Sequence, residues 1–181
     1  MVIEKIDMQG NQRQAVLWAY LAGLIDGEGS FIILKTAVEK IAKSSNSVSP
    51  RYLAFFCIGM VDKAPLDLIR ETIGMGKVYE ERVPERRSMW RIRFGGRLTL
   101  IPFVKQLLPY LIVKKKQAEL LLDFCENWVS PGKKEHGYRD RVSPQELQRR
   151  EQAWQKMRKL NAVGAAATTK SESTRECEAI V

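Results

Sequence analysis

The sequence predicts an α+β fold in which helices cover one face of an antiparallel sheet. Apolar residues recur at helical spacing over residues 15–25, whereas residues 30–35 are rich in β-branched and aromatic side chains. Over residues 89–94 apolar and polar side chains alternate, as expected for a strand with one buried face. The resulting order is helix, two strands, helix, two strands, helices, which is typical of an α+β layout.

The first half of the chain predicts a helix followed by a hairpin. After a short lead-in over residues 1–10, a helix is expected over residues 11–26 and strands over residues 30–35 and 51–58. The polar segment between the strands predicts a long hairpin tip.

A second helix is expected to follow the hairpin. Asp62 is placed to cap it, Pro65 lies in its first turn, and Gly74 ends it.

The second half predicts another hairpin and three helices. The strands are expected over residues 77–83 and 88–94, and helices over residues 98–108 and 115–128. The motif Ser143-Pro-Gln-Glu146 is a capping box that begins a final helix, which is expected to end near Asn161. Small and polar residues then predict a flexible tail over residues 164–181, so the folded domain is expected over residues 11–163.

Composition indicates a folded protein with an acidic partner. The chain has 181 residues, enough for one domain, and 45% of them are hydrophobic. Its 30 Lys and Arg residues outnumber 21 Asp and Glu residues, which gives a net charge of +9. This balance favours a polyanion such as nucleic acid.

The cysteines and the first residues indicate an intracellular protein. Cys57, Cys125 and Cys177 lack the spacing of metal ligands, which favours reduced thiols. Charged residues precede any apolar run, which argues against a signal peptide, and no stretch approaches the roughly 20 apolar residues of a membrane span. We therefore expect a protein of the cytoplasm, the nucleoid or an organelle that is not secreted and has no membrane partner.

The stretch Leu21-Ala-Gly-Leu-Ile-Asp-Gly-Glu-Gly-Ser-Phe31 organises the chain. Ala19, Ala22 and Gly23 are small residues on a helix rich in bulky apolar side chains, so a second backbone could approach this side closely. Gly27 and Gly29 allow positive φ where the helix ends, and Glu28 lies between them. An acid held on a rigid turn is a candidate metal ligand, although a helix that simply ends in a strand accounts for each residue singly.

Taken together, this string resembles the signature of the LAGLIDADG homing endonucleases. Leu-Ala-Gly-Leu-Ile-Asp matches in full, and Gly27-Glu28-Gly29 stands where the family has Ala-Asp-Gly. The motif occurs once, so the chain is similar to the single-motif members, which act as homodimers. The resemblance implies an αββαββα fold over about residues 12–161, with a saddle-shaped sheet whose open face lies in the DNA major groove.

The resemblance also implies a site for a divalent cation, Mg²⁺ or another ion such as Mn²⁺. In the family, the acid at the position of Glu28 binds the metal at the interface of two motif helices. One Glu28 per chain is too little for such a site, so pairing with a symmetry mate is expected, with the Gly27 carbonyl as a further oxygen ligand. By the same resemblance, Lys114 and Lys63 match catalytic cations, whereas Gly59 stands where the family often has glutamine.

Three cations, Lys114, Lys115 and Lys116, lie where a helix is expected to begin, and the helix dipole disfavours them there. A bound polyanion would relieve this cost. The other interpretation is a solvated helix start.

Recognition of DNA is expected from the open face of the sheet. Arg91 and Arg93 are the strongest candidates, because arginine pairs bidentately with guanine, although phosphate contact or solvation is as good an interpretation. Weaker candidates on the strands are Tyr79, Glu81, Met89, Ile32 and Leu34, and phosphate contacts are expected from Lys43, Arg51 and Lys116. The single histidine, His136, is interpreted as a surface residue.

These observations predict a homodimeric, metal-dependent endonuclease for intron homing, which cuts both strands of a long pseudo-palindromic DNA site. The alternative is a non-cleaving relative, either a maturase that binds intron RNA or a DNA-binding regulator. A purely structural dimer would leave the cationic sheet face unexplained.

Overall fold

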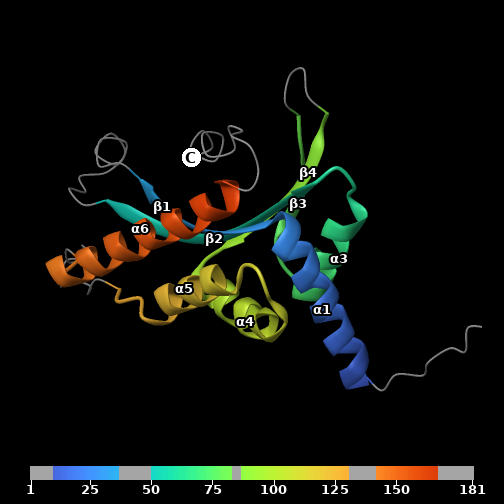
Figure 1. The fold of residues 1–181 in the computed structure, drawn as a ribbon, viewed down its shortest axis with the longest axis horizontal. Helices are drawn as coiled ribbons and strands as arrows, with labels where there is room; N and C mark the ends of the chain where they lie inside the picture. Colours follow the sequence, from blue (N-terminus) through green and yellow to red (C-terminus); the bar gives the residue numbers. More distant parts are fainter. Residues whose placement is uncertain (1–9, 37–49, 83–86, 131–141, 167–181) are drawn as a thin grey trace, which may run out of the picture.

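The computed structural model describes residues 10–36, 50–82, 87–130 and 142–166, and it confirms the α+β fold. Four antiparallel strands form one sheet, and the helices lie against one of its faces (Figure 1). The elements are α1 (Gly10–Glu28), β1 (Gly29–Thr36), β2 (Arg51–Met60), α3 (Ala64–Ile73), β3 (Lys77–Glu81), β4 (Met89–Gly95), α4 (Arg97–Leu107), the 3-10 helix η1 (Leu108–Tyr110), α5 (Lys115–Glu126) and α6 (Pro144–Ala166).

The strand order β1-β2-β4-β3 joins the two predicted hairpins through β2 and β4. Phe31 pairs with Phe56, and Phe56 in turn pairs with Phe94, so these rings lie on the same face of the sheet. The ring centroid of Phe56 lies 5.5 Å from that of Phe31, 5.2 Å from that of Phe94 and 5.1 Å from that of Phe103 on α4. This aromatic cluster is the centre of the core between the sheet and the helices.

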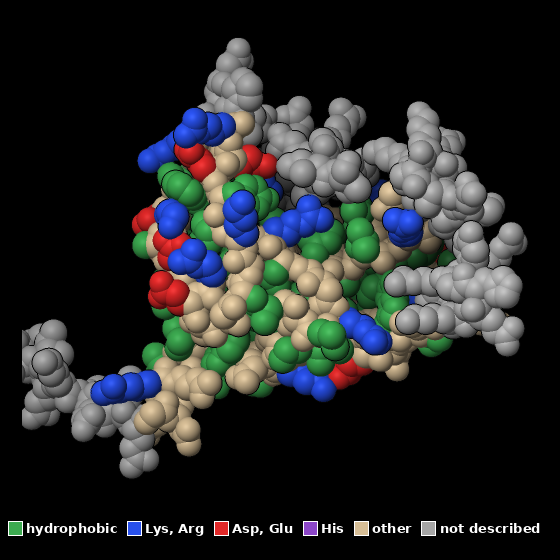
Figure 2. Space-filling model, turned by 180° about the vertical axis from the view of Figure 1, so that it is seen from behind, with side chains coloured by type: hydrophobic (Ala, Val, Ile, Leu, Met, Phe, Trp, Pro, Cys, Tyr) green, Lys and Arg blue, Asp and Glu red, His purple; other side chains and the backbone are tan. Residues whose placement is uncertain are grey.

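No described helix covers the second face of the sheet. Its residues are those between the core positions, because successive side chains of a strand point to opposite faces. Figure 2 shows the molecule from behind, with Lys and Arg side chains distributed over the visible surface and hydrophobic and acidic side chains between them.

The second helix ends at Gly74 as predicted, and it begins one residue later than predicted, because Lys63 and not Asp62 is the N-cap residue. Asp62 accepts a hydrogen bond from the backbone N–H of Ala64 at 3.1 Å, and Pro65 lies in the first turn. Gly74 ends α3 with a φ of 73°.

The predicted role of Gly27 and Gly29 was wrong. Among the described residues, positive φ occurs at Gly74, Gly76 and Gly96, whereas α1 continues through Gly27 to Glu28. Gly29 is instead required by close packing, because a Cβ there would lie 2.9 Å from the Ile25 carbonyl oxygen and from its Cγ2. The helix and β1 therefore join without a loop, so Glu28 directly precedes Gly29, the first paired residue of β1.

The final helix begins as predicted and continues further than predicted. Ser143 Oγ accepts a hydrogen bond from the backbone N–H of Glu146 at 3.2 Å, as in a capping box. The helix runs beyond Asn161 to Ala166, so the predicted domain boundary at Val163 falls inside α6. Residues 1–9 and 167–181, predicted as lead-in and tail, lie outside the described residues.

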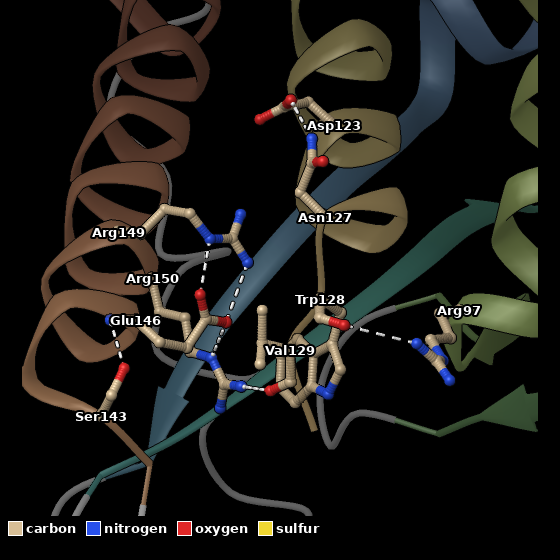
Figure 3. A network of polar contacts seen from close by, with 9 residues as sticks. All are labelled: Arg97, Asp123, Asn127, Trp128, Val129, Ser143, Glu146, Arg149 and Arg150. Atoms are coloured by element: carbon tan, nitrogen blue, oxygen red, sulfur yellow. Dashed lines mark hydrogen bonds and ion pairs between the residues drawn. The ribbon is translucent and has the colours of Figure 1, made fainter. Parts of the chain in front are cut away.

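A buried ion pair attaches α6 to the end of α5 (Figure 3). Arg150 Nε lies 2.7 Å from Glu146 Oε1, and these residues are only 3% and 6% exposed. The Arg150 guanidinium also donates to the Val129 carbonyl at 2.7 Å and lies 3.6 Å from the ring centroid of Trp128. Both charges are thus paired and hydrogen-bonded, as burial requires.

The described cysteines form no disulfide bond. Cys57 and Cys125 are both buried, and burial raises the pKa of the Cys125 thiol to about 11. No described helix combines the length and apolar character needed to cross a membrane.

Candidate functional site

The end of α1 brings a carboxylate to one end of the sheet. Glu28 is the last residue of α1 and is exposed, and the next residue, Gly29, pairs with Ile58 of β2. Since β2 and β4 pair in register, Gly59 lies opposite Arg91. Gly29, the residue after Glu28, therefore lies in the row of paired residues that runs through Ile58 to Ile92, which lies between Arg91 and Arg93 on β4.

The helix start at α5 is capped by an acid from α1. The Asp26 carboxylate accepts hydrogen bonds from the backbone N–H groups of Ile112 at 2.8 Å, Val113 at 3.1 Å and Lys114 at 2.8 Å. A negative charge at a helix N-terminus is favourable. A bound polyanion is therefore not needed to compensate the three lysines at the start of α5, because Asp26 supplies a negative charge there.

Lys114 reaches back from α5 to α1. Its Nζ donates hydrogen bonds to the carbonyl oxygens of Ile25 at 3.1 Å and Gly27 at 3.2 Å. Partial burial lowers the pKa of Lys114, while the charges of Asp26 and Glu28 act in the opposite direction. The arrangement places an ammonium group next to Glu28, and it engages the Gly27 carbonyl that was expected to bind metal.

Lys63 has other partners in the structure. Its ammonium pairs with Asp67 on the next turn of α3 and lies 5.4 Å from the ring centroid of Trp90. Among the described residues, no hydrogen bond or ion pair joins Lys63 to Glu28 or Lys114. A catalytic role of Lys63 stays a prediction, and it requires this side chain to leave Asp67.

The predicted recognition residues do lie together. Residues on the sheet face away from the helices are Ile32 and Leu34 on β1, Arg51 on β2, Tyr79 and Glu81 on β3, and Met89, Arg91 and Arg93 on β4, as the strand registers show. We call this surface the open face. Lys116 is exposed on α5, outside the open face, and Lys43 lies outside the described residues.

The two arginines on the open face are held differently. Arg91 pairs with Glu81, and its guanidinium Nη2 contacts Met89 Sδ at 3.7 Å. Burial acts to lower the pKa of Arg91, but the Glu81 carboxylate and Cys57 outweigh it, and the pKa is raised. The Arg93 guanidinium stacks 3.8 Å from the ring centroid of Phe55, so its edge N–H groups remain free of that contact.

Gly59 has a steric reason to be glycine here. A Cβ at this position would lie 3.2 Å from Arg91 Cγ. A glutamine at this position would therefore compete with Arg91 for the same space above β2.

The described residues of one chain do not complete a metal site. No group of three or more His, Cys, Asp or Glu side chains converges among them. Glu28 and the Gly27 carbonyl supply oxygen ligands, which suit a hard divalent cation, but one chain supplies too few of them. The donors fit such an ion only if a second chain and the phosphates of a nucleic acid add theirs.

One surface of α1 is not covered by any of the described elements. Val16, Tyr20, Gly23 and Gly27 follow one another along a single helix face, and Val16 and Tyr20 are 54% and 49% exposed. We call these four residues the α1 stripe. Ala19 flanks the stripe and is exposed, as predicted for an interface residue.

One predicted interface residue lies elsewhere. Ala22 is fully buried, because it belongs to the opposite side of α1 together with Leu21 and Ile25. The structure therefore removes Ala22 from the predicted interface and leaves Ala19 and Gly23.

Two further apolar side chains are exposed near the end of α1. Ile112 and Val113 are 85% and 70% exposed, and their backbone N–H groups are bound to Asp26 on α1. Exposed apolar side chains therefore occur both on the α1 stripe and in the segment before α5.

The sequence-based prediction did not include Asp26 among the functional residues. A signal was present, since the expected helix at Lys115 is preceded by Ile112 and Val113 and no Ser, Thr, Asp or Asn caps it. A helix start without a local cap indicates an acceptor from elsewhere in the chain.

No family model matches the sequence, and no curated protein matches it. The structure is similar to the homing endonuclease I-CvuI in complex with the I-CreI DNA target in the presence of magnesium, with a TM-score of 0.62 and 20% identity over 89% of this chain and 87% of that chain. It is also similar to the archaeal intron-encoded homing endonuclease I-Vdi141I complexed with DNA, with a TM-score of 0.61 and 18% identity over 84% of this chain and 86% of that chain. The chain therefore has the LAGLIDADG homing-endonuclease fold.

Proposed function

We propose that this chain, which has the LAGLIDADG homing-endonuclease fold, is a site-specific double-strand DNA endonuclease that acts as a homodimer with a divalent cation. The observation that carries the proposal is the contact between Lys114 and the end of α1. An ammonium group bound to the Gly27 carbonyl lies beside Glu28, at the end of a sheet whose open face carries Arg91 and Arg93. The similar structures of I-CvuI and I-Vdi141I are DNA complexes, which supports DNA as the substrate.

Dimerisation is supported by the uncovered apolar surface. The α1 stripe ends at Gly27, one residue before Glu28, so two α1 helices packed along their stripes would bring the two Glu28 residues together. Glycines in the stripe allow close approach of two backbones, while Val16 and Tyr20 supply apolar area. The exposed side chains of Ile112 and Val113 would be covered by the same contact.

The chemistry divides between the acid and the lysine. A divalent cation held by the paired Glu28 carboxylates would activate water and polarise the phosphoryl oxygens. Lys114 has three N–H donors, and its two hydrogen bonds to the Ile25 and Gly27 carbonyls leave one for a phosphate oxygen or a water molecule. A positive charge held at this point stabilises the charge that develops during phosphodiester cleavage.

The open face provides recognition in this proposal. The free edge of the Arg93 guanidinium would pair with a guanine, while stacking on Phe55 fixes the plane of the group. Arg91 can do so only by exchanging Glu81 for a base or a phosphate, so Glu81 would set how readily Arg91 binds.

The test is cleavage of a randomised duplex library by the full chain in Mg²⁺, followed by sequencing of the ends. Cleavage at a single pseudo-palindromic sequence is expected, with no cleavage by Glu28→Gln. Selection of a sequence without cutting would favour the non-cleaving regulator. Absence of DNA selection together with binding of intron RNA would favour the maturase.

A further inference from the structure

Ile112 and Val113, the two residues before Lys114, are held by their backbone and not by their side chains. Ile112 and Val113 have side chains that are 85% and 70% exposed, so burial does little to fix them. Their backbone N–H groups bind Asp26 Oδ2 at 2.8 and 3.1 Å, and that of Lys114 binds Asp26 Oδ1 at 2.8 Å. Both carboxylate oxygens of Asp26 therefore take part in holding the backbone that leads to Lys114.

The contact runs in both directions. Asp26 on α1 accepts from the start of α5, and Lys114 at the start of α5 donates to the Ile25 and Gly27 carbonyls of α1. Each helix terminus thus receives the charge that its dipole favours. Both partners come from segments that also carry the proposed chemistry, since Glu28 follows Asp26 by two residues.

We infer that Asp26 is a positioning residue for the proposed nuclease reaction, which holds Lys114 at a fixed distance from Glu28 through the three backbone N–H groups before α5. The inference rests on the proposed function for its catalytic consequence. Asp26 contacts neither metal nor DNA in this role. It acts through Lys114.

The central variant is Asp26→Asn. Its side chain keeps the size of aspartate but has one acceptor oxygen and a donor NH₂ group, which cannot serve three N–H donors. The matched control is Ser143→Ala, which removes the helix cap at the start of α6, far from Lys114 in the sequence and without a contact to it. Both variants lose a cap, but only the first one loses the hold on Lys114.

The first measurement does not depend on activity. Amide hydrogen exchange of Ile112, Val113 and Lys114 should accelerate in Asp26→Asn, and the side-chain resonances of Lys114 should shift. Neither should change in Ser143→Ala. Unchanged exchange and unchanged Lys114 resonances in folded Asp26→Asn would overturn the inference.

The second measurement is a double-mutant cycle on single-turnover cleavage. Asp26→Asn should lower the rate by about 10²-fold, similar to the loss of one preorganised charge, while DNA binding in Ca²⁺ stays within about threefold of wild type. In a Lys114→Met background the same change should cost less than about threefold, because its target is already absent. Equal losses in both backgrounds would contradict a role through Lys114.

The two measurements separate the inference from the proposed function. A wild-type chain that selects and cuts no DNA refutes the nuclease, while hydrogen exchange still decides whether Asp26 holds Lys114. A cutting wild type with a fully active Asp26→Asn variant leaves the nuclease intact and refutes the positioning role.

Discussion

At the scale of single residues, Glu28 and Lys114 lie side by side but have different tasks in the proposed reaction. Glu28 is exposed and carries the charge that would hold a cation, whereas Lys114 is partly buried and bound to two carbonyls. Their loss should therefore be distinguishable by the dependence of cleavage on metal.

We predict that Glu28→Gln nearly abolishes cleavage while site binding persists, because the amide keeps the size of the side chain and removes its charge. Lys114→Met should leave the metal dependence of the remaining activity near normal and lower the cleavage rate by ~10²–10³. Single-turnover cleavage with titrated Mg²⁺ and binding in Ca²⁺ measure both effects. An actively cutting Glu28→Gln variant would remove this residue from the mechanism.

A second residue-scale prediction concerns Arg93. Arg93→Ala should relax preference at a few symmetry-related base pairs, with ~1–3 kcal/mol lost for each bidentate contact. The control is Arg70→Ala, which removes an exposed charge from α3 on the helical side. Binding to a panel of single-base variants decides the role, since an equal loss on every sequence would identify Arg93 as a phosphate ligand.

For single residues, the sequence predicted which face of the sheet a side chain occupies but not which groups it contacts. The alternation of residues 89–94 was enough to place Arg91 and Arg93 on one face, as observed. It gave no information about Asp26, because its bonds go to backbone groups 86 to 88 residues away. Long-range backbone contacts of this kind leave no periodic pattern.

At the scale of elements, α1 has two apolar sides with different fates. Leu21 and Ile25 are fully buried within the protomer, whereas Val16 and Tyr20 are uncovered. Hydrophobicity alone does not say which side faces the core, so the prediction placed Ala22 in the interface although it is buried. The phase of the helix was decided by packing against the sheet.

The stripe gives a prediction for pairing. A Cβ at Gly23 would meet nothing within 4 Å in the protomer, so Gly23→Leu should fold normally. It should separate the protomers or weaken the dimer by obstructing the second helix, as measured by light scattering over a range of concentrations. Wild-type protein that stays monomeric at micromolar concentration and still cuts both strands would refute the pairing.

A second element-scale prediction concerns the Glu146–Arg150 pair. Burial acts to raise the pKa of Glu146, but hydrogen bonds from Arg149 and Arg150 outweigh it and lower the pKa. Glu146→Gln should lower the free energy of unfolding by ~3–5 kcal/mol at neutral pH, because Arg150 is left buried without its partner. Glu119→Gln, at an exposed position of α5, should change it little.

The pH dependence of that loss follows from the direction of the shift. A carboxyl with a lowered pKa in the folded state stabilises the protein above its unfolded pKa of about 4.3, and the stabilisation disappears as the pH falls through the folded pKa. The difference between wild type and Glu146→Gln should therefore shrink in acid. Urea unfolding at fixed protein concentration over a pH series measures it.

At the scale of the whole molecule, the net charge of +9 predicts a strong effect of salt. Binding of DNA should weaken linearly on a logarithmic scale, with a slope of about −0.9 for each phosphate neutralised. Lys116→Ala should reduce that slope by about 1 if this exposed lysine contacts a phosphate, and Arg70→Ala should leave it unchanged. A slope near zero for wild type would exclude a phosphate-dominated interface.

The order and type of elements were predictable from the sequence, because each helix and strand follows its own local period. The ends of the elements were less predictable. The helix α6 continues through Gly164, although glycine has a low helix propensity. The side chain of Lys63 was placed by resemblance alone, and its pairing with Asp67 reflects a local i, i+4 contact.

The stripe and Glu28 lie on one unbroken helix, and this has a consequence for dosage. Under the proposed function a lone protomer carries half of a site and is inert, so at low expression the active species rises with the square of the protomer concentration. Halving the amount of protein then lowers the number of cutting complexes about fourfold. A cell with few copies is protected from breaks in its own genome by dilution, and a brief burst of translation is enough to start cutting.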